Sequence, residues 1–191
     1  MNYKEVSKEM LMEIIEEKDK LILELKRMKD ELQYQAYMDC VTGVLNRRAG
    51  LCILDTTIEY AARQGTNFII CFADIDDFKK INDTYGHSEG DKILAEVGSI
   101  VKENIRKTDT VFRIGGDEFV IIFPNATLEV AKSICSRIGM KIEELKEEDK
   151  SNYKIGLSYG FSEYNSNNRI AASELIRRAD AGMYVSKGMK K

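Results

Sequence analysis

Four acidic side chains stand at the ends of two apolar segments of this sequence. Asp74 and Asp76 close the segment FIICFADID, and Asp117 and Glu118 open DEFVIIF directly after the pair Gly115–Gly116. A strand that is to be buried should not begin with two carboxylates, because burying a charge is costly unless the charge is paired. Residues i and i+2 of a strand point to one face, so Asp74 and Asp76 can address the same site. If the two strands are neighbours, Asp74 and Asp117 converge at one edge of the sheet.

The residue types limit the chemistry of such a site. Clustered carboxylates without histidine or cysteine make a hard oxygen site, which suits Mg²⁺ or Mn²⁺ rather than zinc. A metal ion there would offset the repulsion between the carboxylates and the charge of a bound triphosphate. His87 is the only histidine, which nearly excludes a zinc site or a triad built on histidine. For each carboxylate taken alone, the alternative is an exposed acidic turn.

The composition narrows the class of partner. The chain has 191 residues, a formal net charge of −3 and 43% hydrophobic residues, which is enough apolar material for one domain with an appendage. No basic footprint argues for a nucleic acid partner. No stretch approaches the ~20 uninterrupted apolar residues of a membrane span, and the N-terminus lacks the shape of a signal peptide. The scattered cysteines, without a CxxC pair, predict a reduced, cytoplasmic protein in which Cys71 is a small core residue.

The first 38 residues contain no glycine and no proline, and their apolar residues recur at alternating steps of three and four. This seam, interrupted by Lys18 and flanked by Glu and Lys, consists of Leu11, Ile14, Leu21, Leu25, Met28 and Leu32. The heptad pattern predicts a coiled coil. The alternative is an amphipathic helix folded back on its own domain, and we prefer the coiled coil because a heptad seam is narrower than the face of a globular helix.

After Asp39 the pattern changes to mixed helices and strands. A helix capped by Asn46 should run to Gln64 and end at Gly65. We further expect a buried strand at 67–76, a short helix at 77–86, a helix at 91–105, a hairpin of 110–114 and 119–123, a helix at 127–148, a strand at 154–161, and a helix from the Ser173 cap towards Lys187. The paired glycines of the hairpin should supply the positive φ angles of a tight primed turn. This order predicts an α+β domain with one sheet covered by helices.

Several motifs in order resemble those of one family. GGDEF, at 115–119, is the signature of the GGDEF family of diguanylate cyclases. DCVTGVLNRR, at 39–48, resembles the family's opening DxLTGLxNRR, with Val41 in place of the usual leucine. DIDDFKKINDTYGHSEGDKIL, at 74–94, is similar to its nucleotide-binding stretch, and LSYGF and RRADAGMYVSK resemble its closing strand and helix. Since separate motifs recur in the right order over residues 39–191, chance is a poor explanation.

The resemblance implies a fold related to nucleotidyl cyclases and polymerase palm domains, with a mostly antiparallel central sheet. It also implies a reaction in which two GTP molecules condense to cyclic di-GMP and release two pyrophosphates. Asp74, the backbone carbonyl of Ile75 and Asp117 would hold two Mg²⁺ or Mn²⁺ ions per active site. Glu118 would assist as a metal ligand or hydrogen-bond partner. One ion would activate the attacking 3′-hydroxyl, and the other would neutralise the triphosphate and the leaving pyrophosphate.

The resemblance also assigns residues that bind the nucleotide. Asn82 and Asp91 match the residues that read guanine, since a carboxylate accepts from N1–H and N2–H₂ while an amide donates and accepts. In isolation, Asn82 would instead be a helix cap and Asp91 an acid favoured near a helix N-terminus. Lys79 and Lys187 match positions that contact phosphates, and we expect Lys79 to be a catalytic residue as well. Lys191 stands where the family has an arginine, and lysine supplies the charge but not the bidentate fork.

A second ligand site and the assembly are implied in the same way. Arg106 and Asp109 of RKTD match the family's RxxD site, where cyclic di-GMP inhibits, and Arg137 matches a further arginine for that ligand. The alternative is a local Arg–Asp pair at a helix end. Each domain carries one GTP half-site, so we expect a homodimer, with residues 1–38 as a helical stalk and 39–191 as the cyclase domain. Met1 is compatible with a native start and with a sensory domain upstream.

Two other functions compete with an active cyclase. The first is a catalytically silent module that binds GTP or cyclic di-GMP and signals through protein contacts. The second is a coiled-coil interaction module, which would leave the carboxylate cluster unexplained. Silent members of the family usually lose the glycines or acids of the hairpin. All five residues are intact here, which favours the enzyme.

Overall fold

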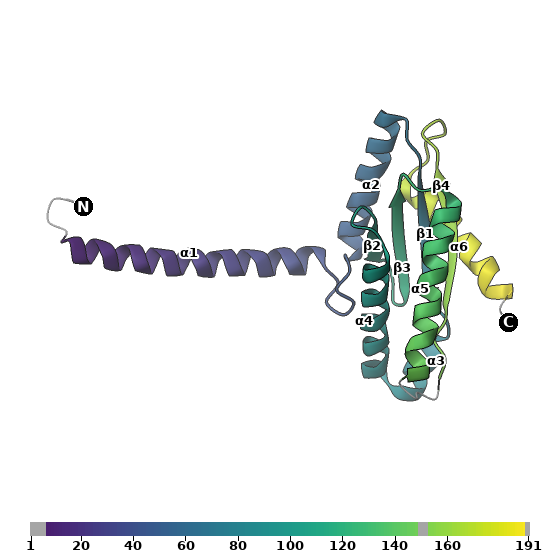
Figure 1. Cartoon of the computed structure of the whole chain (residues 1–191), viewed down its shortest axis with the longest axis horizontal. Coiled ribbons are helices and arrows are strands. Elements are labelled where there is room, and N and C mark those ends of the chain that lie inside the picture. Colours follow the sequence, from purple (N-terminus) through teal and green to yellow (C-terminus); the bar gives the residue numbers. More distant parts are fainter. Residues whose placement is uncertain (1–6, 149–152, 190–191) are drawn as a thin grey trace. The chain divides into compact units, whose positions relative to one another are not determined.

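The computed structural model describes residues 7–148 and 153–189, which divide into two units (Figure 1). The first contains the helix α1, Lys8–Tyr37, and the second begins at Met38. No helix within the described ranges is both long and apolar enough to cross a membrane.

The helix α1 confirms the N-terminal helix expected from the heptad pattern. It begins after Ser7, whose hydroxyl accepts a hydrogen bond from the Met10 amide at 3.2 Å. No residue of α1 is buried, and all of the seam residues from Leu11 to Leu32 are exposed in the single chain. An exposed a/d seam is the surface that a partner helix covers in a coiled coil.

The second unit contains a four-stranded antiparallel sheet in the order β2-β3-β1-β4. The strands are β1 Phe68–Ile75, β2 Thr110–Arg113, β3 Glu118–Pro124 and β4 Leu157–Tyr164. Every residue of β1 is buried, because neighbouring strands and helices cover this apolar run on all sides. Strand β4 begins three residues later than expected, because Ile75 pairs with Leu157 at the start of the ladder.

Five helices accompany the sheet in the described part of this unit. They are α2 Arg47–Gln64, α3 Phe78–Tyr85, α4 His87–Asn104, α5 Leu128–Glu148 and α6 Ala172–Met189. The predicted caps of α2 are confirmed, since the Asn46 side chain accepts from the Ala49 amide at 3.0 Å and Gly65 has φ 68°. Helix α4 starts at His87, four residues earlier than expected. Ser173 is not the cap of α6, because the helical hydrogen bonds already begin at the carbonyl of Ala171.

Alternate side chains of β1 enter two separate cores, which confirms the α+β fold with helices on both faces of the sheet (Figure 1). Ile69 and Cys71 pack in the core that includes residues of α4 and α5. Ile70 and Phe72 pack in the core that includes residues of α2 and α6. Cys71 is fully buried, as its apolar context predicts. The result is three layers, with the sheet between two layers of helices.

Candidate functional site

The pairing of β1 with β3 brings the predicted carboxylates together. Asp74 lies opposite Glu118 in the antiparallel ladder. The amide of Ile75 donates to the carbonyl of Asp117 at 3.2 Å. The condition that these two strands are neighbours is therefore met, and one end of the sheet carries Asp74, Asp117 and Glu118 in a cluster.

The cluster holds excess negative charge. Burial raises the pKa of the Asp74 carboxyl, and the charge of Asp117 raises it further, although Lys187 opposes both effects. Burial also raises the pKa of Glu118, and the charges of Asp117, Asp74 and Asp180 act in the same direction. Each carboxylate disfavours the ionised form of its neighbours, so a bound cation would stabilise the cluster.

Lys187, on the last turns of α6, already places a positive charge there. Its ammonium contacts Oδ1 of Asp74. Burial would lower the pKa of Lys187, but the hydrogen bond and the charge of Asp74 raise it above its ordinary value. The residue expected at the phosphates therefore lies beside the carboxylates.

The oxygen atoms at this end of β1 and β3 fit a hard divalent cation. Carboxylate oxygens of Asp74 and Asp117 and the carbonyl oxygen of Ile75 are the ligand types that Mg²⁺ and Mn²⁺ prefer. Within residues 7–148 and 153–189, no group of three or more His, Cys, Asp or Glu side chains is arranged to hold a metal ion. A metal site here would therefore need the backbone carbonyl as a third protein ligand.

The hairpin that carries Asp117 corrects one expectation. Neither Gly115 nor Gly116 has a positive φ angle, so the predicted primed turn is wrong. The loop is wider, and it closes through the Ile114 amide, which donates to the Glu118 carbonyl at 2.9 Å. Gly115 is required for space instead, because a Cβ there would overlap the carboxylate of Glu118. A Cβ at Gly116 would meet no described atom within 4 Å, which leaves its backbone open to a ligand.

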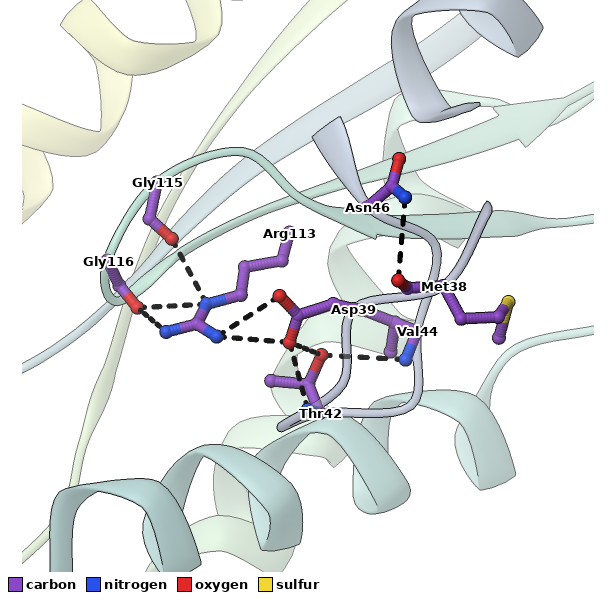
Figure 2. A network of polar contacts seen from close by, with 8 residues as sticks. All are labelled: Met38, Asp39, Thr42, Val44, Asn46, Arg113, Gly115 and Gly116. Carbon is purple, nitrogen blue, oxygen red and sulfur yellow. Dashed lines mark hydrogen bonds and ion pairs between the residues drawn. The ribbon is translucent and has the colours of Figure 1, made fainter. Parts of the chain in front are cut away.

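Arg113 holds the same loop through a network of hydrogen bonds that the sequence did not reveal (Figure 2). The Arg113 guanidinium donates from Nε to the carbonyls of Gly115 and Gly116 at 3.2 and 3.1 Å, and from Nη2 to Gly116 at 2.7 Å. Its Nη1 donates to both carboxylate oxygens of Asp39 at 3.0 and 3.2 Å. Thr42 adds its amide and hydroxyl to Asp39 Oδ1 at 2.9 and 2.8 Å. The start of the second unit is thus bonded directly to the acidic hairpin.

The predicted guanine readers lie on the two helices that meet at Gly86, Asn82 in α3 and Asp91 in α4. The side-chain oxygen of Asn82 is buried and has no hydrogen-bond partner among the described atoms. Gly90 packs against it, since a Cβ at Gly90 would overlap this oxygen. Asp91 follows Gly90 and is exposed. An unpartnered buried acceptor is costly, so this oxygen is suited to a donor supplied by a ligand.

The remaining predicted residues are less closely gathered. Lys79 is exposed on α3, and Lys191 lies outside the described residues. Asp109 accepts from the backbone amide of Arg106 at 2.9 Å, so its contact with Arg106 is a turn and not an ion pair. Arg137 of α5 donates to the carbonyl of Asn104 at 2.6 Å. The three predicted inhibitory-site residues therefore lie at or beside the C-terminal end of α4, with both guanidiniums on exposed residues.

The fold and the site together define an α+β domain with a carboxylate cluster at a glycine-rich hairpin. The chain belongs to the GGDEF family, because the family model described as diguanylate cyclase, GGDEF domain, matches residues 36–191. It is 32% identical over 188 residues to the diguanylate cyclase DosC of Escherichia coli, covering 98% of this chain and 41% of DosC. It is 35% identical over 157 residues to the diguanylate cyclase DgcS of Shewanella oneidensis, covering 82% of this chain and 51% of DgcS. The chain thus spans about half or less of these two relatives.

Solved structures agree with this assignment. The coiled coil and GGDEF domain of DgcB from Caulobacter crescentus, in complex with c-di-GMP, has a TM-score of 0.82 at 27% identity and covers 95% of this chain and 96% of that chain. The diguanylate cyclase SiaD of Pseudomonas aeruginosa, in complex with its activator SiaC, has a TM-score of 0.75 at 26% identity. The match covers 94% of this chain and 68% of the SiaD chain. The likeness to DgcB extends over both the helix and the domain.

Proposed function

We propose that this chain is a diguanylate cyclase, which condenses two GTP molecules into cyclic di-GMP and releases two pyrophosphates. The single observation that carries the proposal is the β1–β3 pairing, which gathers Asp74, the Ile75 carbonyl and Asp117 at one end of the two central strands. The intact hairpin motif, with Glu118 beside them, favours an enzyme over a silent binding module.

The carboxylates act by holding divalent cations. Asp74, the Ile75 carbonyl and Asp117 would bind two Mg²⁺ or Mn²⁺ ions, which when bound neutralise the triphosphate and favour ionisation of the attacking 3′-hydroxyl. Glu118 orders the edge of the site and adds negative charge beside the ligands. Lys187 contacts Asp74 before substrate binds and turns to the triphosphate afterwards. Lys79, on the following helix α3, and Lys191 add positive charge for the phosphates.

Asn82 and Asp91 select guanine. The unpartnered oxygen of Asn82 accepts from the base, and the exposed carboxylate of Asp91 accepts from the N1–H and N2–H₂ edge. Adenine lacks the N1–H and carries a donor where guanine has an acceptor. A site built on such bonds rejects the wrong base because its own polar groups would be left unpaired.

One chain supplies one half-site, so the reaction needs a homodimer. The exposed seam of α1 supports a parallel two-stranded stalk that brings two GTP molecules face to face. We retain residues 1–38 as stalk and 39–191 as cyclase domain, and the division of the structure after Tyr37 supports that boundary. A sensory domain upstream of the stalk would set its register. The four free cysteines and the use of GTP fit a cytoplasmic enzyme.

The product also regulates the enzyme in this proposal. Arg106, Asp109 and Arg137 would bind cyclic di-GMP near the end of α4, away from the carboxylates. The exposed guanidiniums can bond guanine edges or phosphates bidentately. One oxygen of Asp109 already bonds the Arg106 amide, so its other oxygen would face the ligand.

The test is to incubate the protein with GTP and Mg²⁺ and to identify the nucleotide product by mass spectrometry. We expect cyclic di-GMP and pyrophosphate from the wild type, and neither from Asp74→Asn or Asp117→Ala, which should keep the far-ultraviolet circular dichroism of the wild type. Glu118→Gln should weaken turnover. Binding of GTP without any product would support the silent module instead, and near-normal product from Asp117→Ala would refute the assignment of the site.

A further inference from the structure

The two consecutive peptide groups that flank Ile75 are hydrogen-bonded to opposite sides of the sheet. The amide of Asp76 donates to the carbonyl of Gly156 at 2.9 Å, on the side of β4. The amide of Ile75 donates to Asp117 at 3.2 Å, on the side of β3. No peptide bond of the described residues is cis, so the Ile75 carbonyl points opposite to the Asp76 amide. It therefore points away from Gly156 and towards the β3 side, where Asp117 lies.

The side chain of Asp76 locks this peptide in place. The prediction that Asp76 shares a face with Asp74 is confirmed, because the Asp76 carboxylate accepts a hydrogen bond from the Ser158 hydroxyl at 2.5 Å and Ser158 pairs with Asp74 across the ladder. Ser158 is fully buried, in β4, opposite Asp74 in the ladder. A buried hydroxyl is costly when it has no partner, so the Ser158–Asp76 bond is strongly favoured over an open arrangement.

Gly156 leaves the space in which the Asp76 carboxylate reaches Ser158. A Cβ at this position would lie 2.6 Å from Oδ2 of Asp76, so any larger residue would push the carboxylate away from Ser158. The next residue along the chain, Asp77, has φ 57° and ψ 17°, a left-handed conformation that is unfavourable for a residue with a side chain. Such a turn persists only where its surroundings hold it. The contacts from Gly156 and Ser158 hold Asp76, the residue between this turn and the Ile75 carbonyl.

We propose that Ser158, acting through the carboxylate of Asp76, is a positioning residue for the Ile75 carbonyl. The inference rests on the proposed function, in which that carbonyl is a ligand of the divalent cation. Without the hydroxyl, the Asp76 carboxylate loses its bond to β4, and the Ile75 carbonyl is held less firmly towards Asp117. Partners that orient metal ligands typically change metal affinity by ~10–100-fold when they are removed.

The test is a titration of Mn²⁺ followed by electron paramagnetic resonance, with a GTP analogue that cannot be cleaved between the α- and β-phosphates. This readout needs no turnover. Ser158→Ala should bind Mn²⁺ about tenfold more weakly than the wild type, at the low end of the range for such partners. Ser162→Ala is the matched control, because Ser162 is also buried on β4, on the same face, but lies opposite Ile70. It should bind Mn²⁺ as the wild type does.

Two variants at Asp76 test the same inference independently if Ser158→Ala does not fold. Asp76→Asn keeps an oxygen that can accept from Ser158, whereas Asp76→Ala does not, so the loss of Mn²⁺ affinity should be smaller in Asp76→Asn. Equal Mn²⁺ affinity in Ser158→Ala and Ser162→Ala, or in the two Asp76 variants, would overturn the inference. A wild type that binds Mn²⁺ with the analogue but makes no cyclic di-GMP would refute the proposed reaction and leave the positioning role to be judged by the titration.

Discussion

The ion pair between Asp39 and Arg113 should couple the stability of the domain to the position of the acidic hairpin. The perturbation is a double-mutant cycle of Asp39→Ala, Arg113→Ala and the double variant. The two side chains are only 20% and 16% exposed, so the pair lies between a surface ion pair, worth ~0–1 kcal/mol, and a fully buried one, whose rupture costs ~3–5 kcal/mol. We therefore expect Asp39→Ala to cost about 2 kcal/mol and the coupling energy to be about 1.5 kcal/mol.

The effect on activity follows from the other contacts of Arg113. Its guanidinium holds the carbonyls of Gly115 and Gly116 (Figure 2), so a guanidinium that has lost Asp39 no longer fixes the loop before Asp117. If the unfixed loop raises the activation free energy by about 1.4 kcal/mol, kcat falls about tenfold. The KM for GTP should change less, because the proposed guanine readers Asn82 and Asp91 lie in α3 and α4 and not in this loop.

The assay combines urea unfolding at neutral pH with initial rates of cyclic di-GMP formation for all four proteins. Glu174→Ala is the control for a surface pair, because Glu174 bonds Arg177 and Arg178 on the solvent-facing side of α6. Its loss should leave stability close to that of the wild type. A coupling energy near zero, or an Asp39→Ala variant with unchanged kcat, would refute the reasoning.

The remaining predictions concern single features of the structure. Burial alone would raise the pKa of Asp39, but its bonds to Thr42 and Arg113 lower it below 3.8. The ionised carboxylate thus stabilises the fold above that value, and the stability difference between wild type and Asp39→Asn in urea should vanish as the pH falls through the lowered pKa. Gly90→Ala should raise the KM for GTP, since its Cβ would displace the Asn82 side chain, and ATP should be used ~10⁴-fold less efficiently than GTP. Deleting residues 1–36 should lower specific activity at low protein concentration and shift the dimer seen by ultracentrifugation to monomer. Arg106→Ala should weaken inhibition by added cyclic di-GMP while sparing the initial rate, and identical inhibition curves would contradict that site.

Much of the fold could be predicted from local patterns, because the local pattern and the tertiary environment agree there. The run from Phe68 to Ile75 is apolar without interruption, and only a central strand covered on both faces buries every such residue. Helix α2 was bounded correctly by the cap chemistry of Asn46 and by the left-handed Gly65. The meeting of Asp74 and Asp117 was predicted only on the condition that β1 and β3 are neighbours, and the structure supplies that pairing.

The rest depends on partners distant in the sequence, which local patterns do not contain. The pair Asp39–Arg113 spans 74 residues and the pair Ser158–Asp76 spans 82, so neither bond could be read from the motif in which its members stand. The turn at Gly115 was predicted wrongly because two adjacent glycines suggest a primed turn, whereas the loop closes one residue earlier, at Ile114. A glycine in a motif can therefore provide space for a side chain rather than a special backbone angle.

The proposal that two identical half-sites build one product is tested most directly by mixed dimers. Wild type and Asp117→Ala, carrying different tags, are co-expressed, and the mixed dimer is isolated by two affinity steps and incubated with GTP and Mg²⁺. Each half-site forms one of the two phosphodiester bonds, so the mixed dimer should accumulate the linear dinucleotide with one pyrophosphate released and make little cyclic di-GMP. The wild-type dimer should release two pyrophosphates for each cyclic di-GMP. A mixed dimer that makes cyclic di-GMP at half the wild-type rate, without the linear intermediate, would contradict the account.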